Sequence, residues 1–157
     1  MPEILKIAKK YNLKIVEDAA CGFGTKIHDK HVGLFGDAGC FSFHPRKSIT
    51  TGEGGMITTQ NPEIAEKLCR LRDHGATLTD LQRHSGPKPY LLSDHLDAGY
   101  NQRMTDMQGA LGSKQMNRAH SILNNRQIIA NKYINKLKNI DWLILPIKKD
   151  GFFPSIL

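Results

Sequence analysis

Lys47 stands between an apolar run and a glycine-rich turn in the segment CFSFHPRKSITTGEGG, residues 40–55. A lysine held at the end of a strand can form an imine with an aldehyde, although the same residue type is common in solvated turns. Asp18 is the second candidate, because an aspartate can keep a proton on the ring nitrogen of a bound heterocycle. Ser42 and the backbone of ITTGEGG would supply hydrogen-bond donors for an anion such as phosphate. The spacing alone leaves a structural ion pair and a covalent site equally open.

The elements around these residues predict an α/β fold. Apolar residues at helical spacing behind Pro2 predict a helix over 2–11, and a short apolar run over 13–16 predicts a strand that ends in two acids, Glu17 and Asp18. The segments AGCFSFH and GGMITT predict two further strands. In such sheets ligands bind at the carboxyl ends of strands, so the acids and Lys47 are expected at one rim.

A hairpin and a helix follow the same local rules. The segment TKIHDKHVGLFGD predicts a hairpin with Asp29 and Lys30 at its tip, and no set of ligands in the sequence supports a metal site there. Asn61 as N-cap and Pro62 at the first position predict a helix that Gly75 ends. Residues 77–98 lack sustained periodicity and predict a long loop that is either functional or disordered.

The last third of the chain predicts one long amphipathic helix over 105–140. Thr105 and Gln108 match a capping box, and Gly109 and Gly112 predict close packing within the helix. The segment WLILPI then predicts a strand with no partner in the chain. The expectation is therefore a chain that is cut off.

Composition excludes several classes. The 157 residues suit one domain with a core, and the net charge of +7 comes from scattered basic residues without interleaved aromatics. A basic nucleic-acid binder is therefore disfavoured. The three cysteines, Cys21, Cys40 and Cys69, form no CxxC pair, and no segment has the apolar length of a membrane span. These features predict a cytoplasmic protein without disulfides or a zinc site.

Four segments together resemble the DegT/DnrJ/StrS-type sugar aminotransferases, which are fold-type I enzymes that use pyridoxal 5′-phosphate (PLP). They are VEDAACGFGTK, VGLFGDAGCFSFHPRKSITTGEGGMITT, LRDHG and AGYNQRMTDMQGALGSKQ. The resemblance implies residues 1–104 as the C-terminal part of the PLP-binding large domain, 105–140 as a long interdomain helix and 141–157 as the start of a truncated small domain.

The resemblance also implies a role for each site residue. Lys47 matches the lysine that binds the cofactor's aldehyde, and Asp18 matches the aspartate that pairs with the pyridine nitrogen. Ser42 matches a phosphate ligand, and Asn101 matches an asparagine that reaches the phosphate in the neighbouring subunit, which implies a homodimer. Cys21 stands where the family usually has glutamine or histidine beside the cofactor's phenolic oxygen, so that contact is expected to change.

The expected function is that of a fragment of an enzyme that transfers an amino group from glutamate or glutamine to a nucleotide-linked keto-sugar, in surface-polysaccharide or amino-sugar synthesis. The alternative is a truncated chain without PLP activity, or an interaction module that pairs through its long helix. The flanking DNA distinguishes the two, because in-frame matches to the missing parts upstream and downstream would indicate truncation by annotation or frameshift.

Overall fold

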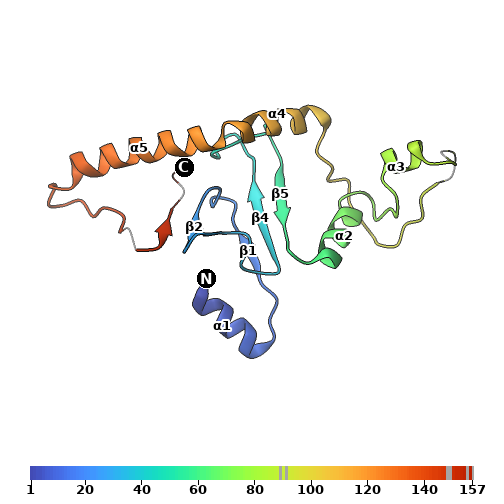
Figure 1. Cartoon of the computed structure of the whole chain (residues 1–157), viewed down its shortest axis with the longest axis horizontal. Helices are drawn as coiled ribbons and strands as arrows, with labels where there is room; N and C mark the ends of the chain where they lie inside the picture. The colour runs from blue at the N-terminus through green and yellow to red at the C-terminus, as the bar shows by residue number, and fades with distance from the viewer. Residues whose placement is uncertain (89, 91, 148–149, 155, 157) are drawn as a thin grey trace. The chain divides into compact units, whose positions relative to one another are not determined.

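The computed structural model describes residues 1–157 apart from 89, 91, 148–149, 155 and 157. Figure 1 shows its elements, which are α1 Pro2–Tyr11, β1 Val16–Asp18, β2 Lys26–Ile27, β3 Lys30–His31, β4 Ala38–Ser42, β5 Gly55–Thr58, α2 Pro62–Leu71, α3 Asp80–Ser85, α4 Asp106–Asn117, α5 Ala119–Leu137 and β6 Phe152–Phe153. They form two compact units, residues 1–59 with 106–157, and residues 60–105. The expected loop 77–98 and the expected small-domain start 141–157 each include residues outside this description.

The first unit is built on a three-stranded mixed sheet in the order β1–β4–β5 (Figure 1). β1 runs parallel to β4, and β5 runs antiparallel to β4. Paired residues point to the same side of a sheet and successive residues to opposite sides. One face therefore carries Glu17, Gly39 and Thr58, and the other carries Asp18, Cys40 and Ile57. The α/β class that the sequence predicts is confirmed, and the sheet is mixed.

A second small sheet has the order β3–β2–β6. The predicted hairpin is confirmed, but its tip is His28 and Asp29, whose φ angles of 48° and 65° are left-handed, and not Asp29 and Lys30, because Lys30 pairs with Ile27 and begins β3. The predicted WLILPI strand is wrong, because residues 142–147 have no strand and Trp142 is 83% exposed. The edge of β2 pairs instead with β6, further along the chain.

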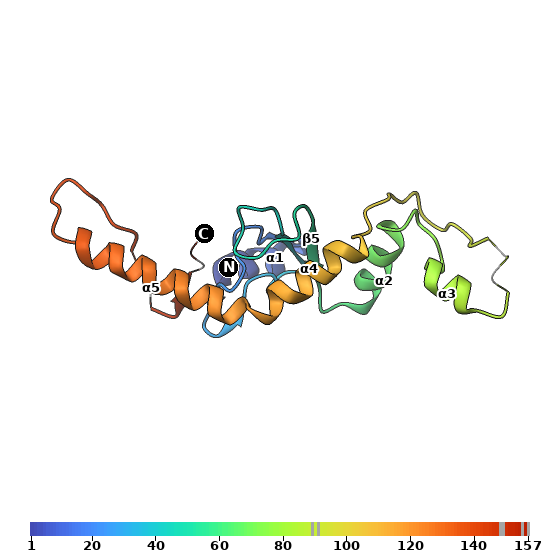
Figure 2. The same ribbon diagram turned by 90° about the horizontal axis from the view of Figure 1, so that it is seen from above.

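Two helices, α4 and α5, stand where the sequence predicts one. Figure 2 shows them following one another, and Arg118 lies between them. The Arg118 N–H donates to the Gln115 carbonyl, three residues back, which tightens the last turn of α4. Close packing at Gly112 is confirmed, because a Cβ there would lie 3.0 Å from Thr51 Cγ2, but a Cβ at Gly109 would meet nothing within 4 Å.

The second unit begins with the predicted helix α2. Asn61 Oδ1 accepts hydrogen bonds from the N–H groups of Glu63 and Ile64, which confirms the predicted cap. The helix ends at Leu71, four residues before Gly75. The sequence misses α3, which begins with a capping box formed by Thr79 and Gln82. That box is a local signal within a segment too short for apolar periodicity to show.

Asp37 ties the start of β1 to the start of β4 and makes this contact sensitive to acid. Its carboxylate accepts hydrogen bonds from Ile15 N–H at 2.8 Å and from Lys14 Nζ at 3.2 Å. The backbone hydrogen bond first, and the lysine second, hold the pKa of Asp37 below its ordinary value of 3.8. A carboxyl with a lowered folded pKa stabilises the fold above its unfolded pKa, and this contribution is lost as pH falls through the folded pKa.

Asp37→Asn should therefore flatten the acid side of the stability curve. We expect the free energy of unfolding of the variant to fall less than that of the wild type as pH drops below 3.8. Urea unfolding followed by circular dichroism at a series of pH values measures the difference. Parallel curves for both proteins in the acid range would contradict the role of Asp37.

Candidate active site

Asp18 ends β1 and begins the turn that carries Cys21. The Asp18 side chain is exposed, and its Oδ1 accepts a hydrogen bond from Ala20 N–H at 3.0 Å. The Ala19 N–H extends the parallel pairing by donating to the Cys40 carbonyl, and the Gly22 N–H donates back to the Ala19 carbonyl. These backbone hydrogen bonds hold Cys21 at the carboxyl end of the sheet.

Lys47 is held by the loop that joins β4 to β5. Phe43 anchors this loop, since it is buried and its carbonyl accepts from Thr51 N–H and Thr50 Oγ1. The Lys47 N–H donates to the His44 carbonyl at 2.9 Å, which forms a tight turn. The side chain of Lys47 is half-buried at the same rim of the sheet as Cys21.

The two turns bring Lys47 against Cys21. Lys47 Nζ lies 2.9 Å from Cys21 Sγ, although the two residues are 26 positions apart in the sequence. Asp18 shares its sheet face with Cys40, and alternation along β4 places Ser42 on that face too. Four of the five predicted site residues thus belong to the carboxyl ends of β1 and β4 or to the turns that follow them.

Asn101, the fifth predicted residue, belongs to the second unit. It is exposed and forms an isolated bridge with Asp73. The neighbouring N–H groups of Tyr100 and Gln102 donate to the carbonyls of Leu71 and Arg72, at the C-terminal end of α2. These backbone contacts fix Asn101 within its own unit.

The glycine-rich turn offers fewer free donors than its sequence predicts. The N–H groups of Thr51 and Gly52 are used inside the loop, on Phe43 O and Thr50 Oγ1. Ser42 Oγ accepts from His44 N–H at 3.3 Å, so its hydroxyl hydrogen can still be donated. Ser48, which the sequence analysis missed, is 5% exposed, and its Oγ has no hydrogen-bond partner within the described part of the chain.

Glu17 does not belong to the candidate site. It is 7% exposed, and its carboxylate accepts hydrogen bonds from the N–H groups of Gly33, Phe35 and Gly36 at 2.5–2.8 Å. The alternation of side chains along β1 sends Glu17 and Asp18 to opposite faces. The expectation that both acids lie at the site is therefore corrected, and the alternation rule could have indicated this from the sequence.

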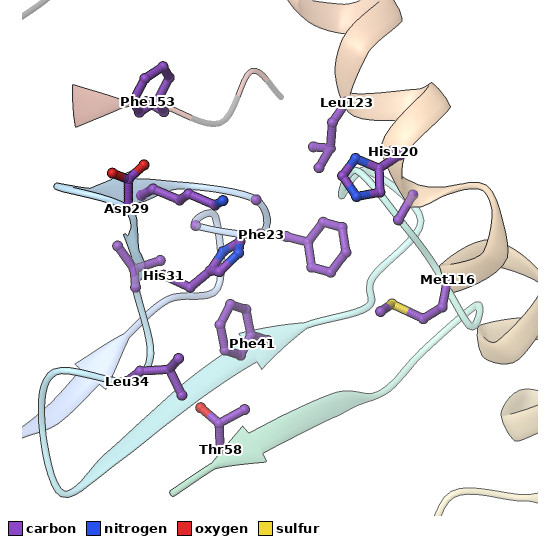
Figure 3. Close-up of a pocket in the computed structure, with 15 residues that line it drawn as sticks. Phe23, Asp29, His31, Leu34, Phe41, Thr58, Met116, His120, Leu123 and Phe153 are labelled. Atoms are coloured by element: carbon purple, nitrogen blue, oxygen red, sulfur yellow. The ribbon is translucent and has the colours of Figure 1, made fainter. Parts of the chain in front are cut away.

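A cavity of about 670 Å³ lies on the Glu17 face of the sheet. Figure 3 shows Phe41 and Thr58 projecting from the sheet, and Met116 and Leu123 projecting from the helices, into one mainly apolar space. Phe41 is two residues from Gly39 along β4, so it shares the face of Glu17. The cavity and the Asp18 side chain thus belong to opposite faces, and the cavity is not part of the candidate site.

The described residues contain no group of three or more His, Cys, Asp or Glu side chains arranged to hold a metal ion. His28 lies at the tip of the hairpin, with its ring 6.1 Å from that of Phe152.

None of the helices described by the structure has the length and apolar character that crossing a bilayer requires.

Comparison with known proteins identifies the family. The sequence model of the DegT/DnrJ/EryC1/StrS aminotransferase family matches residues 1–151. The Uncharacterized protein MJ1066 of Methanocaldococcus jannaschii is 43% identical over 95% of this chain and 39% of its own length. The UDP-4-amino-4,6-dideoxy-N-acetyl-beta-L-altrosamine transaminase of Campylobacter jejuni serotype O:23/36 is 38% identical over 85% of this chain and 33% of its own length.

A solved structure agrees with these relatives. The PLP-form of the putative sugar aminotransferase Spr1654 from Streptococcus pneumoniae matches with a TM-score of 0.76 and 28% identity, over 95% of this chain and 37% of its own. The chain thus spans well under half the length of the proteins it matches. With a match that runs over nearly all of its residues, the chain belongs to the DegT/DnrJ/EryC1/StrS aminotransferase family.

Proposed function

We propose that the protein carrying this chain is a PLP-dependent enzyme that transfers an amino group from glutamate or glutamine to a nucleotide-linked keto-sugar. The family supports amine transfer, and the Campylobacter relative, a transaminase of a UDP-linked amino sugar, supports the substrate class. The observation that carries the proposal is the placement of Lys47, Cys21, Asp18 and Ser42 at one rim of the sheet.

The residues at this rim fit PLP in their chemistry. A bound aldehyde requires an amine, a protonated pyridine nitrogen requires a carboxylate, and a phosphate requires a hydroxyl as hydrogen-bond donor. Asp18 Oδ1 is occupied by Ala20 N–H, while Oδ2 has no hydrogen-bond partner within the described residues. This second oxygen can therefore accept a hydrogen bond from a protonated ring nitrogen. The buried hydroxyl of Ser48, next to Lys47, is a further unused donor.

Each residue then has a distinct task. When bound, PLP supplies an electron sink for the carbon that loses its proton. Lys47 would hold the cofactor through its amine and, once released, would move a proton to and from Nζ. Asp18 would keep the ring nitrogen protonated, and Ser42 would donate a hydrogen bond to the phosphate. Cys21 would orient the Lys47 amine through the contact at 2.9 Å.

We further propose that the complete enzyme is a homodimer in which Asn101 binds the phosphate of the cofactor in the neighbouring subunit's site. The exposure of Asn101 and its anchored backbone support this role. The cytoplasmic location stays a prediction from the cysteine usage of the sequence.

Borohydride reduction tests the assignment of Lys47. The protein is incubated with PLP, reduced with sodium borohydride and digested with trypsin. We expect one phosphopyridoxyl group on Lys47, because borohydride makes the bond between an amine and an aldehyde permanent. Lys14→Arg, at an 82% exposed side chain, should leave the label unchanged, whereas Lys47→Arg should abolish it. A label on a different lysine would overturn the assignment.

A further inference from the structure

Two reactive side chains, the thiol of Cys21 and the amine of Lys47, are in direct contact at the candidate site. Their Sγ and Nζ atoms are 2.9 Å apart. Each side chain projects from a turn held by backbone hydrogen bonds, Gly22 N–H to Ala19 O for the first and Lys47 N–H to His44 O for the second. The contact is therefore set by the ends of two neighbouring strands, β1 and β4, and not by chance collisions of long surface side chains.

The exposure of the two residues suits a reaction with a small oxidant. Cys21 is exposed, so a peroxide can reach its sulfur, while Lys47 is half-buried and stays beside it. The amine is the group placed to attack Sγ first once the sulfur has become electrophilic. Cys40 is less exposed than Cys21, and Cys69 belongs to the second unit.

We propose that Cys21 and Lys47 form an oxidative modification site, in which a hydroperoxide links Sγ to Nζ through a reversible sulfur–nitrogen bond. The crosslink itself requires only these two residues. Its consequence, withdrawal of the Lys47 amine from PLP, rests on the proposed function.

The reaction balances in two steps. The Cys21 thiolate attacks the hydroperoxide, the O–O bond breaks, and an alcohol or water leaves as the sulfur becomes a sulfenic acid, oxidised by two electrons. The neutral Lys47 amine then attacks the sulfur, the S–O bond breaks, and water leaves with one amine proton, without further oxidation. The chain has lost two hydrogen atoms in all. A thiol reverses the link by attacking the sulfur and releasing the amine.

Each step requires one nucleophile. The first step needs the thiolate of Cys21, and the second needs the uncharged amine of Lys47. Other charged residues near the pair in the sequence are Asp18 at the end of β1, and His44 and Arg46 on the loop after β4.

Tryptic mapping makes the test sharp, because the sequence separates the three relevant residues. Cys21 lies in the peptide 15–26, Cys40 in the peptide 31–46, and a modified Lys47 begins the peptide 47–67, since trypsin does not cut at a blocked lysine. The full chain without PLP is treated with hydrogen peroxide, digested and analysed by mass spectrometry. We expect peptide 15–26 joined to 47–67, with a loss of two hydrogens and full reversal by dithiothreitol.

Matched variants and a trapping reagent complete the design. Dimedone, which labels sulfenic acids, should label Cys21 several-fold more in Lys47→Arg than in the wild type, because the competing amine is gone. Lys14→Arg removes a lysine paired with Asp37 and should behave as the wild type. In denaturant the wild-type crosslink should disappear, since it depends on the folded contact.

Three outcomes would overturn the proposal. They are a disulfide that joins peptides 15–26 and 31–46, sulfinic or sulfonic acid on Cys21 with no crosslink, and equal dimedone labelling of the wild type and Lys47→Arg. Failure of the crosslink is distinguishable from failure of the proposed function, because the borohydride label is measured on the reduced wild-type chain and needs no oxidant. A crosslink without a borohydride label would keep the modification site and reject the PLP role.

Discussion

Under the proposed function, Asp18→Asn in the complete enzyme is expected to slow amine transfer by about 10²- to 10³-fold, which is the typical loss when one aligned electrostatic partner of a developing charge is removed. The neutral amide cannot balance the positive charge of a protonated ring nitrogen, so the cofactor would become a weaker electron sink. Asparagine keeps an oxygen that can accept the Ala20 N–H, so the turn after β1 should survive. The free energy of unfolding should therefore change little.

The half-reaction with glutamate measures this effect, because the absorbance of bound PLP changes when the amino group is transferred. Asp29→Asn is the matched control, since it makes the same substitution at the exposed tip of the hairpin, where asparagine tolerates a φ of 65°. Equal rates for the two variants would exclude Asp18 as the partner of the ring nitrogen.

Glu17→Ala is expected to destabilise the protein by about 3–5 kcal/mol, at the upper end of the range for single substitutions. The carboxylate is the acceptor for three backbone N–H groups, that of Gly33, which is buried, and those of Phe35 and Gly36, which are part-buried, and its removal would leave all three without this acceptor. These N–H groups belong to the loop between β3 and β4, so the substitution should loosen this loop from β1. Because native stabilities are only about 5–15 kcal/mol, the variant should unfold at much lower urea concentration.

Two further variants serve as comparisons for the unfolding of Glu17→Ala. Glu17→Gln keeps the size and one acceptor oxygen but turns an NH₂ group toward backbone donors, so it should fall between the wild type and Glu17→Ala. Glu3→Gln, whose side chain is 79% exposed, should unfold as the wild type does. A loss of less than about 1 kcal/mol in Glu17→Ala would show that other groups, such as water, satisfy these donors.

Local sequence rules predicted most of the elements around the site. Pro2 and the apolar spacing after it predicted α1, Asn61 and Pro62 predicted the start of α2, and alternation predicted β4 and β5. These signals act within a few residues, through caps, fixed φ angles and side-chain periodicity, so they can be recognised without knowing the fold. The family was also recognisable, because its motifs occur in order along the chain.

Two details of the fold differ from what these local rules predict. Helix periodicity continues across Arg118, but the chain tightens into an i→i−3 turn there and the helix is interrupted. An apolar run predicts a strand over WLILPI, yet a strand also needs a partner edge, and β2 pairs with Phe152–Phe153.

The same division holds at the candidate site. The sequence alone determined that an amine and a carboxylate follow two strand ends, because residue types and strand signals are local. Only the tertiary structure decided that Asp18 and not Glu17 faces away from the cavity, and that Cys21 touches Lys47. The physical reason is that side-chain direction and contact depend on which strands pair and in which register, and this is set by packing over the whole unit.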